Sequence, residues 1–201
     1  QDHPDELQLE AAVLEARPGA LAVARSPFFP GGGGQMADRG TAAWSGGEAK
    51  VVGIEAAGDL LWHHLDGVAE AAGSVLLSVD PVFRALMSEL HTVAHIANAV
   101  AFQAFDGALL TGAQLGDQAT LRIDLDLPDT DNDRVRALAG PMNEVIARDL
   151  AVRSFDMPQD AAEAEPGLFR SKGVSPPPQD DGLVRIVEIS ELDRQACGGS
   201  P

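Results

Sequence analysis

The sequence has a single cysteine and no long apolar run. Cys197 is the only cysteine among 201 residues, and one cysteine cannot form an internal disulfide bond, which favours a reducing compartment. No apolar stretch reaches the roughly 18 residues that a membrane-spanning helix needs. The polar, acidic segment 1–10 does not have the composition of a secretory signal peptide. We therefore expect a cytoplasmic protein without a membrane partner.

Basic residues are also scarce. The chain has 14 Lys and Arg against 31 Asp and Glu, a formal net charge of −17. This balance opposes non-specific attraction to nucleic acid and counts against a broad nucleic-acid surface. The charge balance does not exclude a small basic surface patch, and the candidate residues for it are Arg25, Arg39, Arg84, Arg170 and Lys172. Because 45% of the residues are hydrophobic, we expect a substantial core in one large domain or two small ones.

The N-terminal part of the sequence alternates short apolar segments with Gly and Asp. The segments that we expect to form strands are 20–24, 50–54, 60–65 and 74–79. Their spacing predicts a small β-barrel-like domain over residues 1–79. His63 and His64 are adjacent in one of these strands and so point to opposite faces. We interpret both as structural.

A run of four glycines, Gly31 to Gly34, precedes Gln35. Glycine tolerates positive φ and lets backbone amides approach a ligand closely, and Gln35 adds a donor and an acceptor. A flexible turn is the commoner explanation of such a run. No Lys-Ser or Lys-Thr follows, so the segment is not a phosphate loop of the Walker type.

A long helix is expected to begin after Asp80, a suitable N-cap, with Pro81 as its first residue. One stripe along it is apolar: Val82, Phe83, Leu86, Leu90, Val93, Ala97, Val100, Ala101 and Ala104. A second stripe at helical spacing is polar: Arg84, Ser88, His91, His95 and Asn98. The histidines lie outside the apolar stripe, so we expect the polar line to face a cleft or solvent.

His91 and His95 are four residues apart and therefore one turn apart on the same helix face. This spacing suits a shared zinc ion, although an ordinary histidine pair is about equally common. The pair supplies only two ligands. We expect the fold to bring the distant Cys197 to His91 and His95.

The remaining segments alternate between helical and strand patterns. We expect a loop at 107–116, a half-buried strand at 119–127, and a helix from about 129 to 146 that Pro141 kinks. Further on, the expected elements are a strand at 151–155, a short acidic helix at 159–166, an irregular loop through 169–178 and a buried strand at 183–189. With the β-rich N-terminal part, they predict an α+β protein.

Several short motifs occur in a definite order along nearly the whole chain. They are Phe28-Phe29-Pro30, Gly32-Gly33-Gly34-Gln35, Asp38-Arg39-Gly40, His91-Thr92-x-x-His95, the strand 184–189 and the segment 193–199. Together they resemble the AlaX-type aminoacyl-tRNA editing proteins, free-standing relatives of the editing domain of alanyl-tRNA synthetase and, more distantly, of threonyl-tRNA synthetase. The resemblance implies an editing domain over residues 80–201, with a long zinc-ligand helix packed on an antiparallel sheet.

The resemblance also implies zinc as cofactor, with His91, His95 and Cys197 as ligands. The family's fourth ligand position falls on Pro201, whose side chain cannot bind a metal. Either three protein ligands leave an open position, or the sequence is truncated at its C-terminus.

The implied reaction is hydrolysis of the ester that joins a wrong amino acid to the 3′ end of a tRNA. Gln35 and Thr92 are the candidate catalytic residues. The candidate substrate-binding residues are Gly32, Gly33, Gly34, Gln35, Arg39 and Gln195. Seryl or glycyl groups on alanine tRNA are the first expected substrates, and threonine tRNA carrying an analogue such as fluorothreonine is the second. A non-catalytic tRNA- or protein-binding relative without zinc is the alternative of another class. Either a monomer or a homodimer is compatible with the sequence.

Overall fold

The computed structural model describes residues 5–58, 60–67, 71–127, 129, 131–172 and 182–201. Close contacts divide the chain into two units, Gln1–Ser88 with Ser200 and Glu89–Gly199 with Pro201. Helix α1 (Pro81–Ala104) contains the boundary between them. Each unit is described by itself. The division into domains at residues 79 and 80 stays a prediction.

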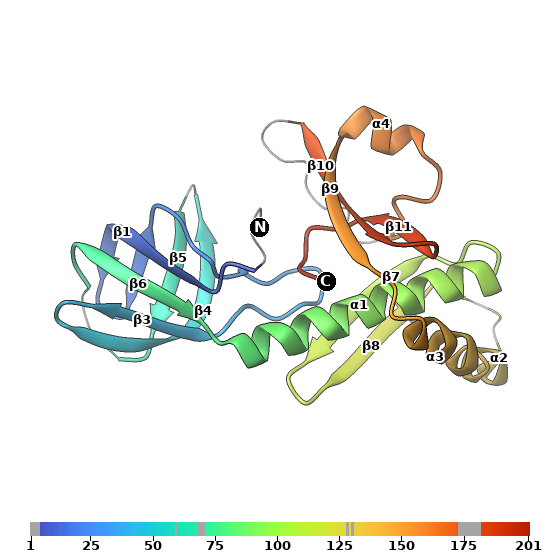
Figure 1. Cartoon of the computed structure of the whole chain (residues 1–201), viewed down its shortest axis with the longest axis horizontal. Coiled ribbons are helices and arrows are strands. Elements are labelled where there is room, and N and C mark those ends of the chain that lie inside the picture. Colours follow the sequence, from blue (N-terminus) through green and yellow to red (C-terminus); the bar gives the residue numbers. More distant parts are fainter. Residues whose placement is uncertain (1–4, 59, 68–70, 128, 130, 173–181) are drawn as a thin grey trace. The chain divides into compact units, whose positions relative to one another are not determined.

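The first unit contains a closed antiparallel barrel (Figure 1). Its strands are β1 (Gln8–Arg17), β2 (Ala20–Val23), β3 (Gly40–Trp44), β4 (Gly47–Ala57), β5 (Leu60–Leu65) and β6 (Ser74–Val79). They pair in the order β1-β2-β5-β4-β3-β6, and closure removes the open edges that an exposed sheet would present. Leu21, Leu77 and Val75 are almost completely buried in the barrel core. The predicted β-barrel is thus confirmed.

Gly40 allows two barrel strands to approach closely. A Cβ atom added to this residue of β3 would lie 2.0 Å from the carbonyl oxygen of Ser78 on β6. Since that separation is far below van der Waals contact, any side chain here requires the strands to move apart. The absence of a side chain at Gly40 therefore lets β3 pair closely with β6 at this point.

Helix α1 begins as the sequence predicts. Asp80 Oδ1 accepts hydrogen bonds from the backbone amides of Val82 at 2.9 Å and Phe83 at 3.1 Å, which is N-cap geometry. The apolar stripe is only partly confirmed, because Val82 is 77% exposed and points away from the core. The polar stripe does not face solvent at three positions: Arg84, His95 and Asn98 are buried.

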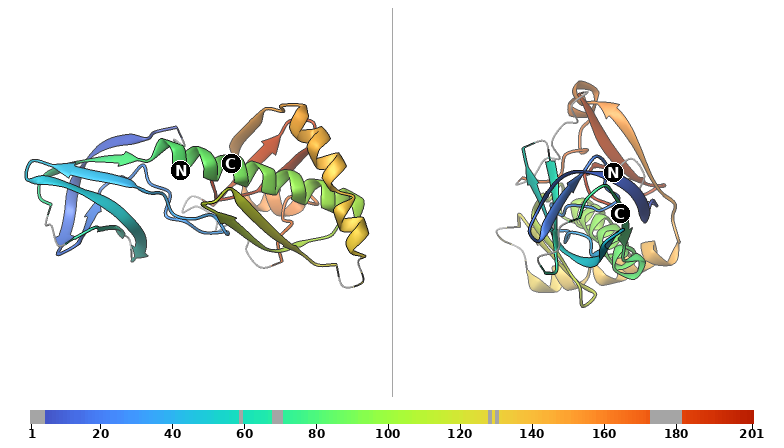
Figure 2. Two further views of the ribbon diagram at one scale, coloured as in Figure 1. Left: turned by 90° about the horizontal axis from the view of Figure 1, so that it is seen from below. Right: turned by 90° about the vertical axis from the view of Figure 1, so that its left-hand side faces the viewer.

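The second unit combines the rest of α1 with two small sheets and short helices. Its further elements are β7 (Leu110–Gly116), β8 (Thr120–Leu125), α2 (Asn132–Arg136), α3 (Ala139–Ala147), β9 (Val152–Pro158), α4 (Gln159–Ala164), β10 (Leu183–Ile189) and β11 (Asp193–Ala196). Strands β7 and β8 form a hairpin that runs beside α1 (Figures 1 and 2), and β11-β10-β9 form an antiparallel sheet. The α+β class is thus confirmed.

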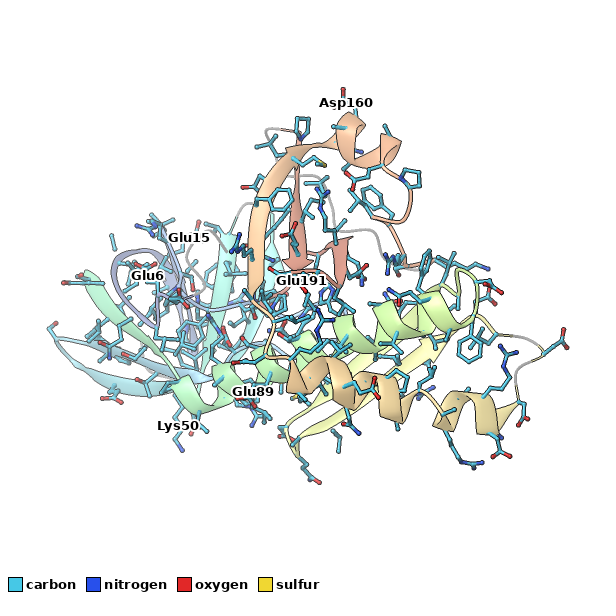
Figure 3. The ribbon with its side chains drawn as sticks, turned by 45° about the vertical axis from the view of Figure 1, so that its right-hand side comes forward. Glu6, Glu15, Lys50, Glu89, Asp160 and Glu191 are labelled. Carbon is cyan, nitrogen blue, oxygen red and sulfur yellow. The ribbon has the colours of Figure 1, made fainter. Side chains whose placement is uncertain are left out.

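A hydrophobic cluster joins α1 to the three-stranded sheet. Ile96 and Val100 of α1 are buried together with Ile189 of β10, and Met142 and Val145 of α3 pack against them. Helix α4 lies at the far end of this sheet, where Figure 3 places Asp160 on the outer surface. The cluster fixes the face of α1 that meets β10 and β11.

Two predictions for this part of the chain were wrong. Segment 107–116 is not wholly a loop, because β7 gains a full antiparallel partner in β8 and buries Leu115. The helix expected from 129 to 146 is two helices, and Pro141 lies in the first turn of α3 instead of kinking a longer helix. Proline fits that turn because its missing N–H has no helical acceptor there. Residues 173–178 of the expected irregular loop lie outside the described residues.

In the part of the chain that the structure describes, no helix combines the length and apolarity needed to cross a bilayer.

Candidate metal centre

Three potential metal ligands meet in the second unit. His91 and His95 project from α1 with their rings stacked, the centroids 5.1 Å apart. Cys197 follows directly after β11, and its Sγ lies 3.3 Å from His91 Nε2. One ligand atom from each residue lies within 4.8 Å of the others. The structure therefore brings Cys197 to the two histidines, as the sequence predicts, and the three residues form a group that could hold a metal ion.

Burial keeps both imidazoles neutral at physiological pH. It lowers the pKa of His91 to about 4, with a smaller contribution from the charge of Arg185. The pKa of His95 falls to about 3, again chiefly through burial and then through His91 and the arginines Arg185 and Arg170. Neutral imidazole is the form that binds a metal. Burial raises the pKa of the Cys197 thiol, so bound metal would have to favour the thiolate.

The donor set fits zinc. Two imidazole nitrogens and one thiolate sulfur are common zinc ligands, and three protein ligands with one open position are typical of catalytic zinc sites. His95 Nε2 is buried without a hydrogen-bond partner, an unfavourable state that a metal ion would relieve. Among the described residues, this is the one such group of His, Cys, Asp and Glu side chains.

Arg185 of β10 holds the backbone around Cys197. Its Nη1 donates to the carbonyl oxygen of Gly199 at 2.7 Å and to that of Cys197 at 3.3 Å. The amide of Cys197 donates to the Arg185 carbonyl oxygen at 3.0 Å, and the amide of Gly199 lies 3.4 Å from Cys197 Sγ. We assigned Arg185 no role from the sequence, where its only signal is a charge inside an apolar strand.

The other candidate residues of the second unit are Thr92 and Gln195. Thr92 is partly buried beside His91 on α1. Gln195 of β11 is buried, and both ends of its side-chain amide are hydrogen bonded: Oε1 accepts from Asn98 Nδ2 at 2.8 Å, and Nε2 donates to Asp193. Asn98 is therefore a further buried polar partner on the histidine face of α1.

The candidate residues of the glycine-rich segment belong to the first unit. Gly32 and Gln35 close a tight turn with two backbone hydrogen bonds of 3.0 Å, and the central residues Gly33 and Gly34 have φ values of 60° and 92°. A turn with positive φ at both central residues favours glycine. Gln35 is buried, and its side-chain amide is hydrogen bonded to Ser200, which also groups with this unit.

Arg39 follows the glycine-rich segment and is exposed. Its guanidinium lies 4.3 Å from the ring centroid of Phe83, within the same unit. The contact places a cation at the start of helix α1.

A separate pocket of about 430 Å³ opens in the second unit between the segments 165–170 and 188–194. Its charged side chains pair with arginines: Arg194 contacts Glu165 at 3.0 Å, and Arg148 contacts Glu191, labelled in Figure 3, at 2.7 Å. The three candidate metal ligands do not line it, so we do not treat this pocket as the candidate site.

The fold and the site define an α+β protein with a barrel, a long helix and a His/His/Cys group. Comparison with known proteins narrows this class. The chain is 30% identical to the alanyl-tRNA editing protein AlaX-M of Saccharolobus solfataricus over 198 residues, which cover 96% of this chain and 80% of AlaX-M. It is 33% identical to an alanine–tRNA ligase of Korarchaeum cryptofilum and 34% identical to one of Caldivirga maquilingensis. No family model matches the chain.

The chain therefore belongs to the family of AlaX-type alanyl-tRNA editing proteins. The two ligase alignments cover 96% and 95% of this chain, but the chain matches only 22% of the length of each ligase.

Proposed function

We propose that this protein is a zinc-dependent deacylase that hydrolyses mischarged aminoacyl-tRNA. The observation that carries the proposal is the convergence of His91, His95 and Cys197 within 4.8 Å in a chain of the AlaX family. Ser or Gly attached to alanine tRNA is the proposed substrate.

In this proposal, His91, His95 and Cys197 hold the zinc ion. When bound, zinc supplies either a Lewis acid for the ester carbonyl or water, or an anchor for the substrate's amino group or terminal ribose. The neutral state of both imidazoles at physiological pH supports their role as ligands. Arg185 fixes the backbone that carries the thiol.

The protein's own polar groups bind and orient the aminoacyl end. An aminoacyl ester is already activated, so the site has mainly to position water and to stabilise the developing oxyanion. We assign this work to the side-chain amide of Gln35 and to the backbone amides of Gly32, Gly33 and Gly34. Thr92, next to a ligand, contributes to the shape of the pocket. The reaction needs no Ser-His-Asp triad.

Partner binding is assigned to the aminoacyl 3′ end of tRNA. With a net charge of −17, the protein gains little from non-specific attraction to the tRNA backbone. Recognition therefore depends on local contacts at the acceptor end, and Arg39 is the proposed cation there. Its exposure supports this assignment.

The proposal is tested by a deacylation assay on purified protein with zinc quantified in the same sample. The panel contains Ser-tRNA and Gly-tRNA for alanine, correctly charged Thr-tRNA, and threonine tRNA charged with fluorothreonine. Selective hydrolysis of the alanine tRNA substrates with about one zinc per chain supports the proposal. Selective hydrolysis of the fluorothreonine substrate identifies a threonine-analogue deacylase instead. Neither hydrolysis nor zinc, from a chain verified as full length, favours a non-catalytic binding protein.

A further inference from the structure

The candidate metal ligands come from two parts of the fold that are far apart in the sequence. His91 and His95 are on α1, whereas Cys197 follows β11, and 106 residues separate His91 from Cys197. A metal site requires donor positions accurate to a few tenths of an ångström. Some contact must therefore fix β11 against this face of α1.

The pair formed by Asn98 and Gln195 lies next to the ligands on both elements. Asn98 is three residues after His95 and therefore on the same face of α1. Gln195 is two residues before Cys197, so the two side chains leave an extended chain on the same side. The hydrogen bond from Asn98 Nδ2 to Gln195 Oε1, 2.8 Å long, thus forms a second connection beside the contact between His91 and Cys197.

The other end of Gln195 is anchored as well. Its Nε2 donates to Asp193, and Asp193 forms a buried ion pair with Arg170. Arg170 donates from Nε to the Gly167 carbonyl oxygen at 2.8 Å, and its guanidinium lies 4.1 Å from the ring centroid of Phe102 on α1. The chain of contacts therefore leaves α1 at Asn98 and returns to it one turn later at Phe102.

The side-chain amide at position 195 makes both hydrogen bonds because it carries an acceptor and a donor. The acceptor Oε1 faces the Asn98 amide, and the donor Nε2 faces the Asp193 carboxylate. A glutamate would bring a second carboxylate to Asp193, and an apolar side chain would leave the Asn98 amide without this acceptor. Because Gln195 and Asn98 are both buried, losing either bond is costly.

We propose that Gln195 and Asn98 are positioning residues, which hold Cys197 at the distance from His91 and His95 that metal binding needs. The proposal rests on the proposed metal-dependent function. It assigns the Gln195 amide to the protein's own framework instead of to the substrate. Residues that orient metal ligands without binding the metal themselves commonly contribute about 10- to 100-fold to metal affinity.

The test compares Gln195→Met, which keeps the side-chain length and loses both hydrogen bonds, with Arg194→Met as matched control. Arg194 is the adjacent residue of β11, and its side chain is 37% exposed and pairs with Glu165. Purified proteins are titrated with Co²⁺, whose thiolate-to-cobalt absorption reports directly on Cys197. We expect about tenfold weaker Co²⁺ binding and a reduced thiolate band for Gln195→Met, and neither change for Arg194→Met.

A second measurement works without metal. Cys197 is the only thiol in the chain, so its alkylation by iodoacetamide in chelator-treated protein reports on how firmly it is held. We expect alkylation several-fold faster in Gln195→Met than in the wild type or in Arg194→Met. If Gln195→Met does not fold, Asn98→Leu removes the same connection from the helix side and is measured in its place.

The outcomes separate the two proposals. Unchanged Co²⁺ affinity, absorption and alkylation in Gln195→Met would overturn the positioning role, as would equal changes in Arg194→Met. A wild-type chain that binds neither Co²⁺ nor zinc would overturn the proposed function. In that case the alkylation rates still decide whether Gln195 and Asn98 hold the thiol in place.

Discussion

Asp38 and Arg84 form a buried ion pair that joins the end of the glycine-rich segment to the start of helix α1. The Arg84 Nε lies 3.0 and 3.1 Å from the two carboxylate oxygens, and Nη2 also donates to the Pro27 carbonyl oxygen at 2.8 Å. Asp38 in turn accepts from the Phe29 amide at 2.5 Å. The pair thus secures both ends of the segment that contains the four glycines.

This pair gives the first prediction, which concerns stability. Replacing Arg84 by Met leaves the Asp38 carboxylate buried without its cation, so we expect the free energy of unfolding to fall by about 3–5 kcal/mol. Removing both charges, as Asp38→Asn with Arg84→Met, should cost less than the sum of the single changes. Urea unfolding of the four proteins measures the coupling. Additive losses would show that the two side chains do not depend on each other.

The second prediction concerns the metal ligands. We expect His95→Ala to lose stoichiometric zinc and deacylation together, because the change removes the imidazole nitrogen proposed to bind the metal. His64→Ala is the control, since His64 pairs with Glu55 on the barrel and should keep both. Zinc content and deacylation are measured on the same preparations. Full activity of a metal-free His95→Ala protein would end the zinc hypothesis.

The third prediction separates catalysis from metal binding. Replacing Gln35 by Ala should slow turnover while the zinc content stays that of the wild type, because Gln35 is not among the candidate ligands. Initial rates on the alanine tRNA substrates and zinc analysis provide the measurement. Turnover equal to the wild type would remove Gln35 from the site.

The fourth prediction addresses position 201, where the family resemblance implies a fourth metal ligand and this chain has proline. Pro201→His places an imidazole four residues after Cys197, and we expect tighter zinc binding than in the wild type. Competition with a chromogenic chelator measures the affinity. Unchanged affinity would show that a side chain at position 201 does not reach the metal.

The fifth prediction is a pH dependence that arises in the barrel. Burial lowers the pKa of His63 to about 4 from 6.5, and its Nε2 lies 2.7 Å from Ser26 Oγ. Because the pKa of His63 is lower in the folded protein than in the unfolded chain, protons bind the unfolded chain first. The contribution of neutral His63 to the free energy of unfolding is therefore complete above pH 6.5 and is lost as the pH falls toward 4. The loss amounts to about 3 kcal/mol.

The comparison protein for this pH effect is His63→Gln, which keeps a polar group at the site and does not titrate. Unfolding free energies of the chelator-treated wild type and variant are measured between about pH 7.5 and about pH 4. We expect the wild type to lose more stability over this range. Parallel curves would place the acid sensitivity elsewhere, for instance at His91 and His95.

Much of the fold follows from local sequence signals. The Asp80-Pro81 pair marks the start of α1, and the alternation of Leu121, Ile123 and Leu125 marks β8. Strand β7 escaped prediction because its sequence, Leu110–Gly116, has little alternation or β-branching. Its strand conformation depends on hydrogen bonds to β8, and pairing between strands is not a property of one segment.

The candidate metal group was predictable in part. Helical spacing aligns His91 with His95, and Cys197, the only cysteine of the chain, is the expected third ligand; the sequence does not give the contacts that hold it there. The role of Asn98 depends on a contact with Gln195, 97 residues away in the sequence. The role of Arg185 depends on contacts that begin with Cys197, 12 residues away. Such contacts become visible only when the packing of β10 and β11 on α1 is known.

The separation of the ligands along the chain also sets an order of events during protein synthesis. Both histidines leave the ribosome with helix α1, whereas the thiol follows 106 residues later. At about 5–20 residues per second, that interval lasts about 5–20 s. Throughout it, a nascent chain contains two of the three candidate ligands, so the complete His/His/Cys group cannot form until the segment that carries Cys197 has been made.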